Sequence, residues 1–370
     1  MNRKPKIALC LPGGGATGAM FQIGALAALE DGIEGVHAHE LDLYVGTSSG
    51  ATVAATLAGG RPVERSYRAF LDPADVYFPL ERKHIFRMDF AEWRRTIVSA
   101  ASALRHGTAS LLSRGPAPTP AQLWEELDRL FDSLPAGLFS LDAYERFLED
   151  FFVRRGVPNN FAMMPRELFI LAHDLDTGEQ VEFGAKGFDQ VPVSRACIAS
   201  MAVPPFFSPV RIWDRHYIDA GAAQVAHFDV AVKAGANLII VVNPMVPVHA
   251  GSVPTGHGPR TSVRDKGMMW VTNQAIRIGI HKLMRETCAR VTASGQADIL
   301  LIEPEPTDGI LFMHNPASFA ARRKILEYGY RATRARVAEW FRTGEPALAR
   351  AGWRMAQARD SRPAPAEERA

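Results

Sequence analysis

Residues 6–58 alternate short apolar runs, glycine-rich turns and small-residue segments, and this order restricts the fold more than any other feature of the chain. Short apolar runs predict buried strands, and apolar residues at helical spacing predict helices. Strands that alternate with helices form a mainly parallel sheet with helices on its faces. The predicted order is a strand at 6–11, a glycine loop at 13–18, a helix at 19–30, a strand at 41–45, a tight turn at 46–50 and a helix at 51–58.

The remaining chain continues this α/β pattern after a different central stretch. Residues 61–165 place a proline-rich segment between segments of helical composition, so we expect a helical insertion or cap there. The tail at 356–370 mixes alanine, proline and charged residues, which predicts disorder. We therefore expect one α/β domain over residues 1–355. Its later strands are predicted at 168–173, 180–183, 238–242 and 298–302, with a hairpin at 210–218 and helices at 193–201, 228–234, 268–290 and 317–341.

Composition excludes several classes of protein. Hydrophobic residues make up 47% of the chain and charged residues 22%, as in ordinary globular domains, so global disorder is excluded. The formal charge of +2 argues against a protein that mainly holds nucleic acid. The 3 cysteines lie far apart, so they predict neither a disulfide framework nor a metal cluster and fit a reducing compartment such as the cytoplasm. No apolar run approaches about 18 residues, so no membrane-spanning helix is expected.

Residues 13–18 read Gly-Gly-Gly-Ala-Thr-Gly and follow a predicted strand, as G-x-G-x-x-G loops do. In a dinucleotide site, the N–H groups of such a loop hold a pyrophosphate, and an acidic residue ends the second strand. Here that strand runs into Gly46-Thr47-Ser48, and Asp42 lies near its start. In an acyl hydrolase, the same N–H groups hold the oxyanion of the intermediate. A purely structural tight turn is the third interpretation.

Two further motifs bear on this choice. Gly46-Thr47-Ser48-Ser49-Gly50 is G-x-S-x-G at a predicted strand-to-helix junction. That is the context of a nucleophile elbow, where a sharp turn exposes the serine oxygen, and it favours the oxyanion interpretation. The segment 217–221, Tyr-Ile-Asp-Ala-Gly, delivers Asp219 from a strand into a turn of small residues. Taken alone, such an aspartate usually caps its own backbone.

Together these segments resemble the patatin-like phospholipases. The order and spacing of the three motifs carry the resemblance, which covers residues 6–60 and 166–245. The stretches 199–207 and 173–178 also look like family segments. Residues 61–165 and the region after about 250 are not covered.

The resemblance implies a three-layer α/β/α sandwich and a Ser–Asp dyad, with Ser48 as the nucleophile and Asp219 as the base. The implied reaction is hydrolysis of a carboxylic ester of a lipid through an acyl-enzyme, without a metal or cofactor. Burial would raise the pKa of Asp219 and strengthen it as a base. The implied oxyanion hole is formed by Gly13, Gly14 and Gly15, and the supporting motif positions are Gly18, Gly46, Gly50, Ala220 and Gly221.

The chain departs from the family pattern at three places. Thr17 stands where the family often has Arg or Lys, and Ala220 replaces a glycine, so a positive φ there would strain the backbone. Residues 225–227, Val-Ala-His, replace an Asn-Leu-Pro run. Two other functions stay open: a nucleotide-binding oxidoreductase that uses residues 13–18, and a lipid-binding pseudoenzyme disabled by these departures.

Histidines and a basic segment raise two last questions. His227, His249 and His314 follow Asp219, as the histidine of a hydrolase triad does, although an ordinary packing role is the simpler interpretation of His227. Residues 81–114 combine basic with aromatic and aliphatic side chains. We expect this segment either to lie on an anionic membrane or to form a solvated face of the cap.

Overall fold

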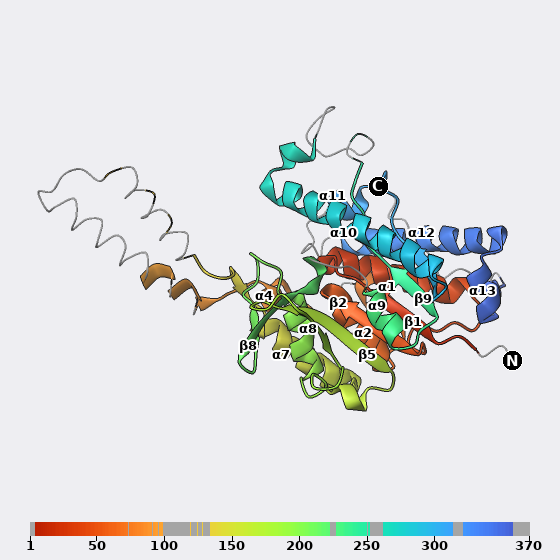
Figure 1. The fold of residues 1–370 in the computed structure, drawn as a ribbon, viewed down its shortest axis with the longest axis horizontal. Helices are drawn as coiled ribbons and strands as arrows, with labels where there is room; N and C mark the ends of the chain where they lie inside the picture. Colours follow the sequence, from red (N-terminus) through yellow and green to blue (C-terminus); the bar gives the residue numbers. More distant parts are fainter. Residues whose placement is uncertain are drawn as a thin grey trace, which may run out of the picture.

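The structure is a computed structural model, and it describes residues 4–72, 74–90, 92–94, 96–98, 119, 124, 128, 134–222, 227–249, 251, 262–313 and 321–357. Its main sheet has the strand order β10-β9-β1-β2-β5-β8-β7, and β6 also pairs with β5. Neighbours from β10 to β5 run parallel, whereas β6 and β8 run antiparallel to β5. The strands are β1 (Ile7–Leu11), β2 (Leu43–Thr47), β5 (Glu167–Asp174), β6 (Gln180–Phe183), β7 (Val210–Ile212), β8 (Arg215–Asp219), β9 (Leu238–Val242) and β10 (Asp298–Ile302) (Figure 1).

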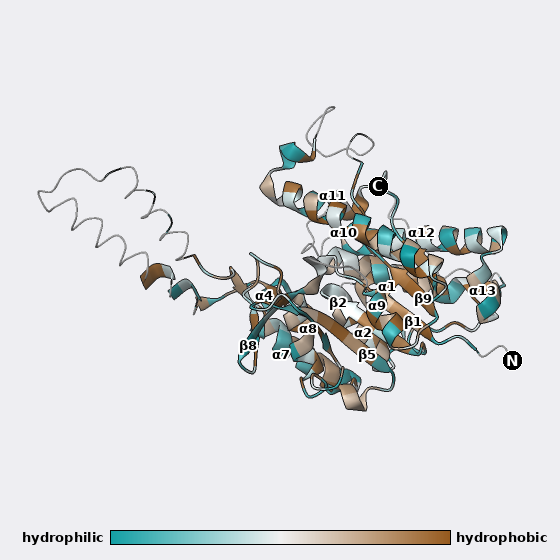
Figure 2. Ribbon diagram, in the orientation of Figure 1, coloured by the Kyte–Doolittle hydropathy of each residue, from teal (hydrophilic) through white to brown (hydrophobic). Residues whose placement is uncertain are grey.

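The central strands are short continuous apolar runs, and this is why they lie in the middle of the sheet. Every residue of β1, β2 and β9 is buried. Continuous burial is typical of parallel strands covered by helices on both faces. Figure 2 shows the same arrangement, with hydrophobic strands between helices of mixed hydropathy. The strands predicted at 180–183, 238–242 and 298–302 have these bounds in the structure.

Helices cover both faces and give three layers (Figure 1). Successive residues of β1 point to opposite faces, so Leu9 joins the core made with α1, α2, α8 and α12, and Cys10 joins the core made with α9 and α10. This confirms the predicted three-layer α/β/α fold with a mainly parallel sheet. The helices are α1 (Gly15–Gly32), α2 (Ser49–Ala58), α8 (Val193–Met201), α9 (Phe228–Lys233), α10 (Met268–Ala293), α11 (Ile310–Met313), α12 (Arg322–Thr343) and α13 (Pro346–Ala351).

The expected insertion follows α2. Its described residues form α3 (Val63–Leu71), α4 (Arg82–Ile85), α7 (Asp142–Arg155) and a small antiparallel pair, β3 (Arg87–Met88) with β4 (Phe139–Ser140). α7 buries Phe151 and Phe152 in the same core as α1 and α2, so this part of the segment packs into that core.

Parts of two predicted segments lie outside the described residues. These are 99–114 of the basic segment and 358–370 of the tail. The backbone N–H of Ala356, where the predicted tail begins, donates to the carbonyl of Gly32 at 3.0 Å. Among the described helices, none combines the length and hydropathy that crossing a membrane requires.

Candidate active site

Ser48 lies at a sharp turn between β2 and α2, where the elbow motif predicts it. Its φ of 55° and ψ of −130° belong to a conformation that side chains rarely adopt, at a cost of about 1–3 kcal/mol. The flanking glycines allow the turn. A Cβ on Gly50 would lie 2.0 Å from the carbonyl oxygen of Leu11, and a Cβ on Gly46 would lie 2.6 Å from the Cα of Ala51. No larger residue fits at either position without moving the backbone.

The glycine loop is shorter than predicted, because two glycines reverse the chain within it. Gly14 has a φ of 149° and Gly15 a φ of 63°, and α1 begins at Gly15 rather than at residue 19. A Cβ on Gly13 would lie 2.7 Å from the Cβ of Ser48, so the loop backbone lies directly against that side chain. Within the described part of the chain, the N–H groups of Gly13 and Gly14 donate to no other protein group. They stay available to a ligand beside Ser48.

Strand register brings Asp219 to the same level along the strands as Ser48. Thr47 of β2 pairs with Leu171 of β5, and on the other side of β5 Asp219 pairs with Ala172. β2 and β8 therefore end at the same level, although one runs parallel to β5 and the other antiparallel. The topology thus places two residues that are distant in the sequence on either side of β5, near its carboxyl end.

The Asp219 carboxylate is buried and hydrogen-bonded. It accepts a hydrogen bond from the backbone N–H of Gly221 at 2.6 Å. Its exposed fraction is 3%. Burial raises the pKa of Asp219 to about 6, and the nearby Ser48 hydroxyl and the Gly221 N–H oppose this rise. The group is therefore mostly ionised at neutral pH and is a stronger base than an exposed aspartate.

Ser200 supports the elbow from α8. Its Oγ accepts a hydrogen bond from the backbone N–H of Ser48 at 2.8 Å and donates to the carbonyl of Leu171 at 2.5 Å. Because the N–H of Ser48 is engaged in this way, it cannot also bind an oxyanion. The sequence marks Ser200 only as part of the family-like stretch 199–207, and no local pattern assigns it this contact.

Buried polar side chains also support the back of the glycine loop, and no sequence motif marks them. Gln22 donates from Nε2 to the carbonyl of Pro12 at 2.5 Å. Arg277 of α10 donates from Nη1 to the carbonyl of Pro244 at 3.0 Å. Pro244 fills the space behind Gly14, where a Cβ would meet its Cγ at 2.8 Å. Burial lowers the pKa of Arg277 to about 10, so the guanidinium keeps its charge at neutral pH.

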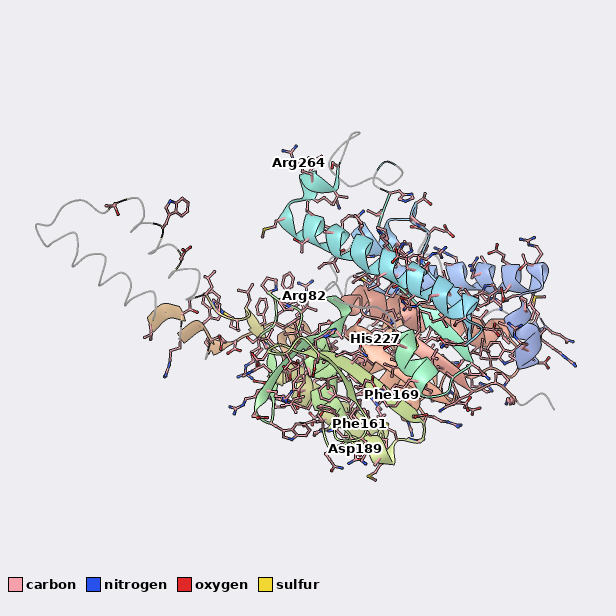
Figure 3. The ribbon with its side chains drawn as sticks, in the orientation of Figure 1. Arg82, Phe161, Phe169, Asp189, His227 and Arg264 are labelled. Carbon is pink, nitrogen blue, oxygen red and sulfur yellow. The ribbon has the colours of Figure 1, made fainter. Side chains whose placement is uncertain are left out.

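Among the described residues, His227 hydrogen-bonds Gln180 and neither Ser48 nor Asp219. It lies fully buried at the start of α9 (Figure 3). Its Nδ1 hydrogen-bonds Oε1 of Gln180 at 3.1 Å. Burial, together with nearby His173, lowers the pKa of His227 to about 3, so its ring is neutral. The backbone N–H of His249 donates to Pro306. The third predicted candidate, His314, lies outside the described residues.

The departures from the family pattern fit the local structure. Thr17 is buried, and its Oγ1 donates to the carbonyl of Gly14 at 3.3 Å. Ala220 begins a short 3-10 turn, Ala220–Ala222, and is not among the residues with positive φ. The strain anticipated at residue 220 therefore does not arise. Residues 225 and 226 of the third departure lie outside the described residues.

Comparison with known families agrees with this geometry. A model of the family described as patatin-like phospholipase matches residues 9–232, which include all three motifs. The chain belongs to the patatin-like phospholipase family. This membership places it in a class of lipid ester hydrolases and leaves the nucleotide-binding interpretation of residues 13–18 without support. No curated protein matches this patatin-like chain.

Three solved structures are similar to this patatin-like chain at low sequence identity. VipD of Legionella pneumophila is 14% identical, with 91% of this chain and 67% of VipD covered and a TM-score of 0.38. Human GIVD cytosolic phospholipase A2 is 12% identical, with coverages of 94% and 60% and a TM-score of 0.40. ExoU of Pseudomonas aeruginosa is 16% identical, with coverages of 91% and 53% and a TM-score of 0.32. The chain thus spans about half to two thirds of the length of these proteins.

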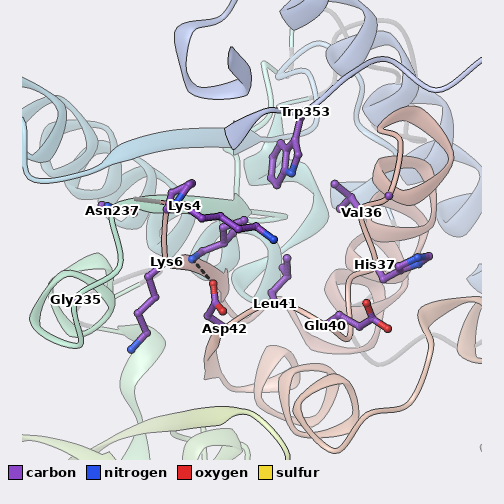
Figure 4. Close-up of a pocket in the computed structure, with 13 residues that line it drawn as sticks. Lys4, Lys6, Val36, His37, Glu40, Leu41, Asp42, Gly235, Asn237 and Trp353 are labelled. Carbon is purple, nitrogen blue, oxygen red and sulfur yellow. Dashed lines mark hydrogen bonds between the residues drawn. The ribbon is translucent and has the colours of Figure 1, made fainter. Parts of the chain in front are cut away.

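A cavity of about 550 Å³ lies at the opposite ends of the strands, where β1, β2 and β9 begin (Figure 4). Its lining includes Lys4, Lys6 and Trp353. Parallel sheets bind ligands at the carboxyl ends of their strands, so this cavity is separate from the Ser48 site. No group of three or more His, Cys, Asp and Glu side chains in the described ranges is arranged to hold a metal ion.

Proposed function

We propose that this chain hydrolyses carboxylic esters of lipids through a covalent acyl-enzyme on Ser48. The proposal is carried by one observation: Ser48, held at a strained turn, lies beside the buried Asp219 carboxylate and lowers its pKa. A nucleophilic serine requires a nearby base, and Asp219 is the candidate for that role. Among the described residues, His227 hydrogen-bonds Gln180 and neither Ser48 nor Asp219, which favours a dyad over a triad.

In the proposed reaction, Ser48 Oγ attacks the ester carbonyl carbon while its proton passes to Asp219. The negative charge that develops on the carbonyl oxygen is stabilised by the N–H groups of Gly13, Gly14 and Gly15, at the N-terminus of α1. The protonated Asp219 then gives its proton to the leaving alcohol, and an acyl-Ser48 ester remains. Asp219 next accepts a proton from the water that attacks this ester, and it returns that proton to Ser48 as the acid leaves.

Substitution of Ser48 tests the proposal. Ser48→Ala should abolish hydrolysis of short p-nitrophenyl esters and covalent labelling by a fluorophosphonate probe, while the circular dichroism spectrum stays unchanged. Ser294→Ala is the matched control, because Ser294 caps the far end of α10 and should leave both activities intact. Turnover at the wild-type rate in Ser48→Ala would exclude Ser48 as the nucleophile. A wild-type protein that binds lipid but is not labelled would instead be a pseudoenzyme.

A further inference from the structure

A second cavity, of about 80 Å³, lies beside the candidate active site between α1, α2, α3 and α7. In α2 its lining begins at Ser49, the residue after Ser48, and in α1 it begins at Ala16, the residue after Gly15. The N-termini of both helices lie at the proposed oxyanion hole. The cavity therefore starts next to the position where an ester would be attacked.

The lining of this cavity suits a hydrocarbon chain. Along α2, Ser49, Thr52, Val53 and Thr56 lie on one face of the helix, as their spacing dictates. The hydroxyl of Thr52 hydrogen-bonds the hydroxyl of Tyr144 at 3.0 Å, and the hydroxyl of Thr56 donates to the carbonyl of Thr52 at 2.8 Å. None of the lining residues carries a charge. A charged head group finds no partner here, whereas an apolar chain does.

Ser49 supplies an independent sign of a ligand. Its side chain is 6% exposed, and its Oγ has no hydrogen-bond partner among the described residues. An unpaired buried hydroxyl is unfavourable, so native proteins rarely keep one without a reason. An ester oxygen positioned for attack by the neighbouring Ser48 would give this hydroxyl an acceptor.

We propose that this cavity holds the acyl chain of the ester, with Ser49 contacting the ester group and Phe70, Phe78 and Ile85 among the apolar residues that enclose the chain. The inference rests on the proposed function, since it assigns the acyl subsite of the same reaction. An apolar cavity of about 150 Å³ holds a benzene molecule, so about 80 Å³ holds only a few carbon atoms. Short acyl chains are therefore the preferred substrates, and the lining residues set the limit.

Variants that fill or enlarge the cavity test this assignment with p-nitrophenyl acetate, butanoate and octanoate. Val53→Phe fills the cavity from α2 and should lower kcat/KM for butanoate by about tenfold or more, while acetate turnover changes by less than about threefold. Val153→Phe, on the exposed face of α7, makes the same substitution away from the cavity and should leave all three esters unaffected. Phe70→Ala enlarges the cavity and should raise octanoate turnover by about fivefold or more.

Equal losses of acetate and butanoate turnover in a folded Val53→Phe protein would overturn the assignment, because the chain would then lie elsewhere. If Val53→Phe does not fold, Phe70→Ala decides: an unchanged preference between butanoate and octanoate would overturn the proposal. Binding of 1-butanol separates the cavity from the chemistry. It should raise the melting temperature of wild type and Val153→Phe but not of Val53→Phe. Butanol binding without any ester hydrolysis would refute the proposed function and with it the acyl assignment, leaving only an apolar binding site.

Discussion

Replacing Asp219 with asparagine should make this protein more stable and nearly inactive. Asparagine has the same shape and keeps an acceptor oxygen for the N–H of Gly221, but it carries no charge to bury. Burial raises the pKa of the wild-type carboxyl from 3.8 to about 6, and this difference corresponds to about 3 kcal/mol. Because the folded pKa is the higher one, the folded state binds the proton more tightly. The stability that the folded state gains from this tighter proton binding is fully present below about pH 4 and is lost as the pH rises through about 6.

Urea unfolding at two pH values measures this difference. The gain from Asp219→Asn should be about 3 kcal/mol at about pH 8 and roughly half of that at about pH 5. Hydrolysis of p-nitrophenyl butanoate should fall by about a hundredfold or more, the usual effect of losing a general base. Asp214→Asn, in the exposed β7–β8 turn, is the matched control and should change neither quantity. A variant no more stable than wild type at pH 8, or equally stabilised at both pH values, would refute the burial argument.

Three further predictions concern catalysis. The kcat/KM of the wild type should rise with pH and reach half its plateau near pH 6, because Asp219 loses its proton there. If this midpoint of the pH profile disappears in His227→Asn, the base is His227 instead. His227→Asn, which tolerates the φ of 38° at this position, should keep activity within about threefold of wild type, and a folded but inactive variant would support a triad. Gly13→Ala should lower kcat by about tenfold or more, because its Cβ would meet Ser48 at 2.7 Å. Gly279→Ala is the control and should leave kcat unchanged, because a Cβ there has no atom within 4 Å. Equal rates for the two variants would show that the loop does not form the oxyanion hole.

Much of the fold follows from local patterns in the sequence. The buried strands β9 and β10 have the predicted bounds because a continuous apolar run is stable only in the interior of such a sheet. The elbow around Ser48 was likewise predictable, since Gly46 and Gly50 are needed wherever a strand turns into a closely packed helix. The start of α1 was predicted too late because a glycine does not reveal the sign of its φ.

Other features depend on contacts between distant parts of the chain. Ser200, Gln22 and Arg277 support the site through backbone carbonyls or N–H groups of other segments, and such partners leave no local pattern.

The sequence by itself determined which residues can supply a nucleophile, a base and close backbone donors, because motif spacing and glycine positions are local properties. The tertiary structure alone decided that Ser48 and Asp219 lie on either side of β5 and that burial raises the pKa of the carboxylate. Strand register sets the placement of the two residues, and exclusion of water raises the pKa of Asp219. Both arise only when segments far apart in the chain pack together.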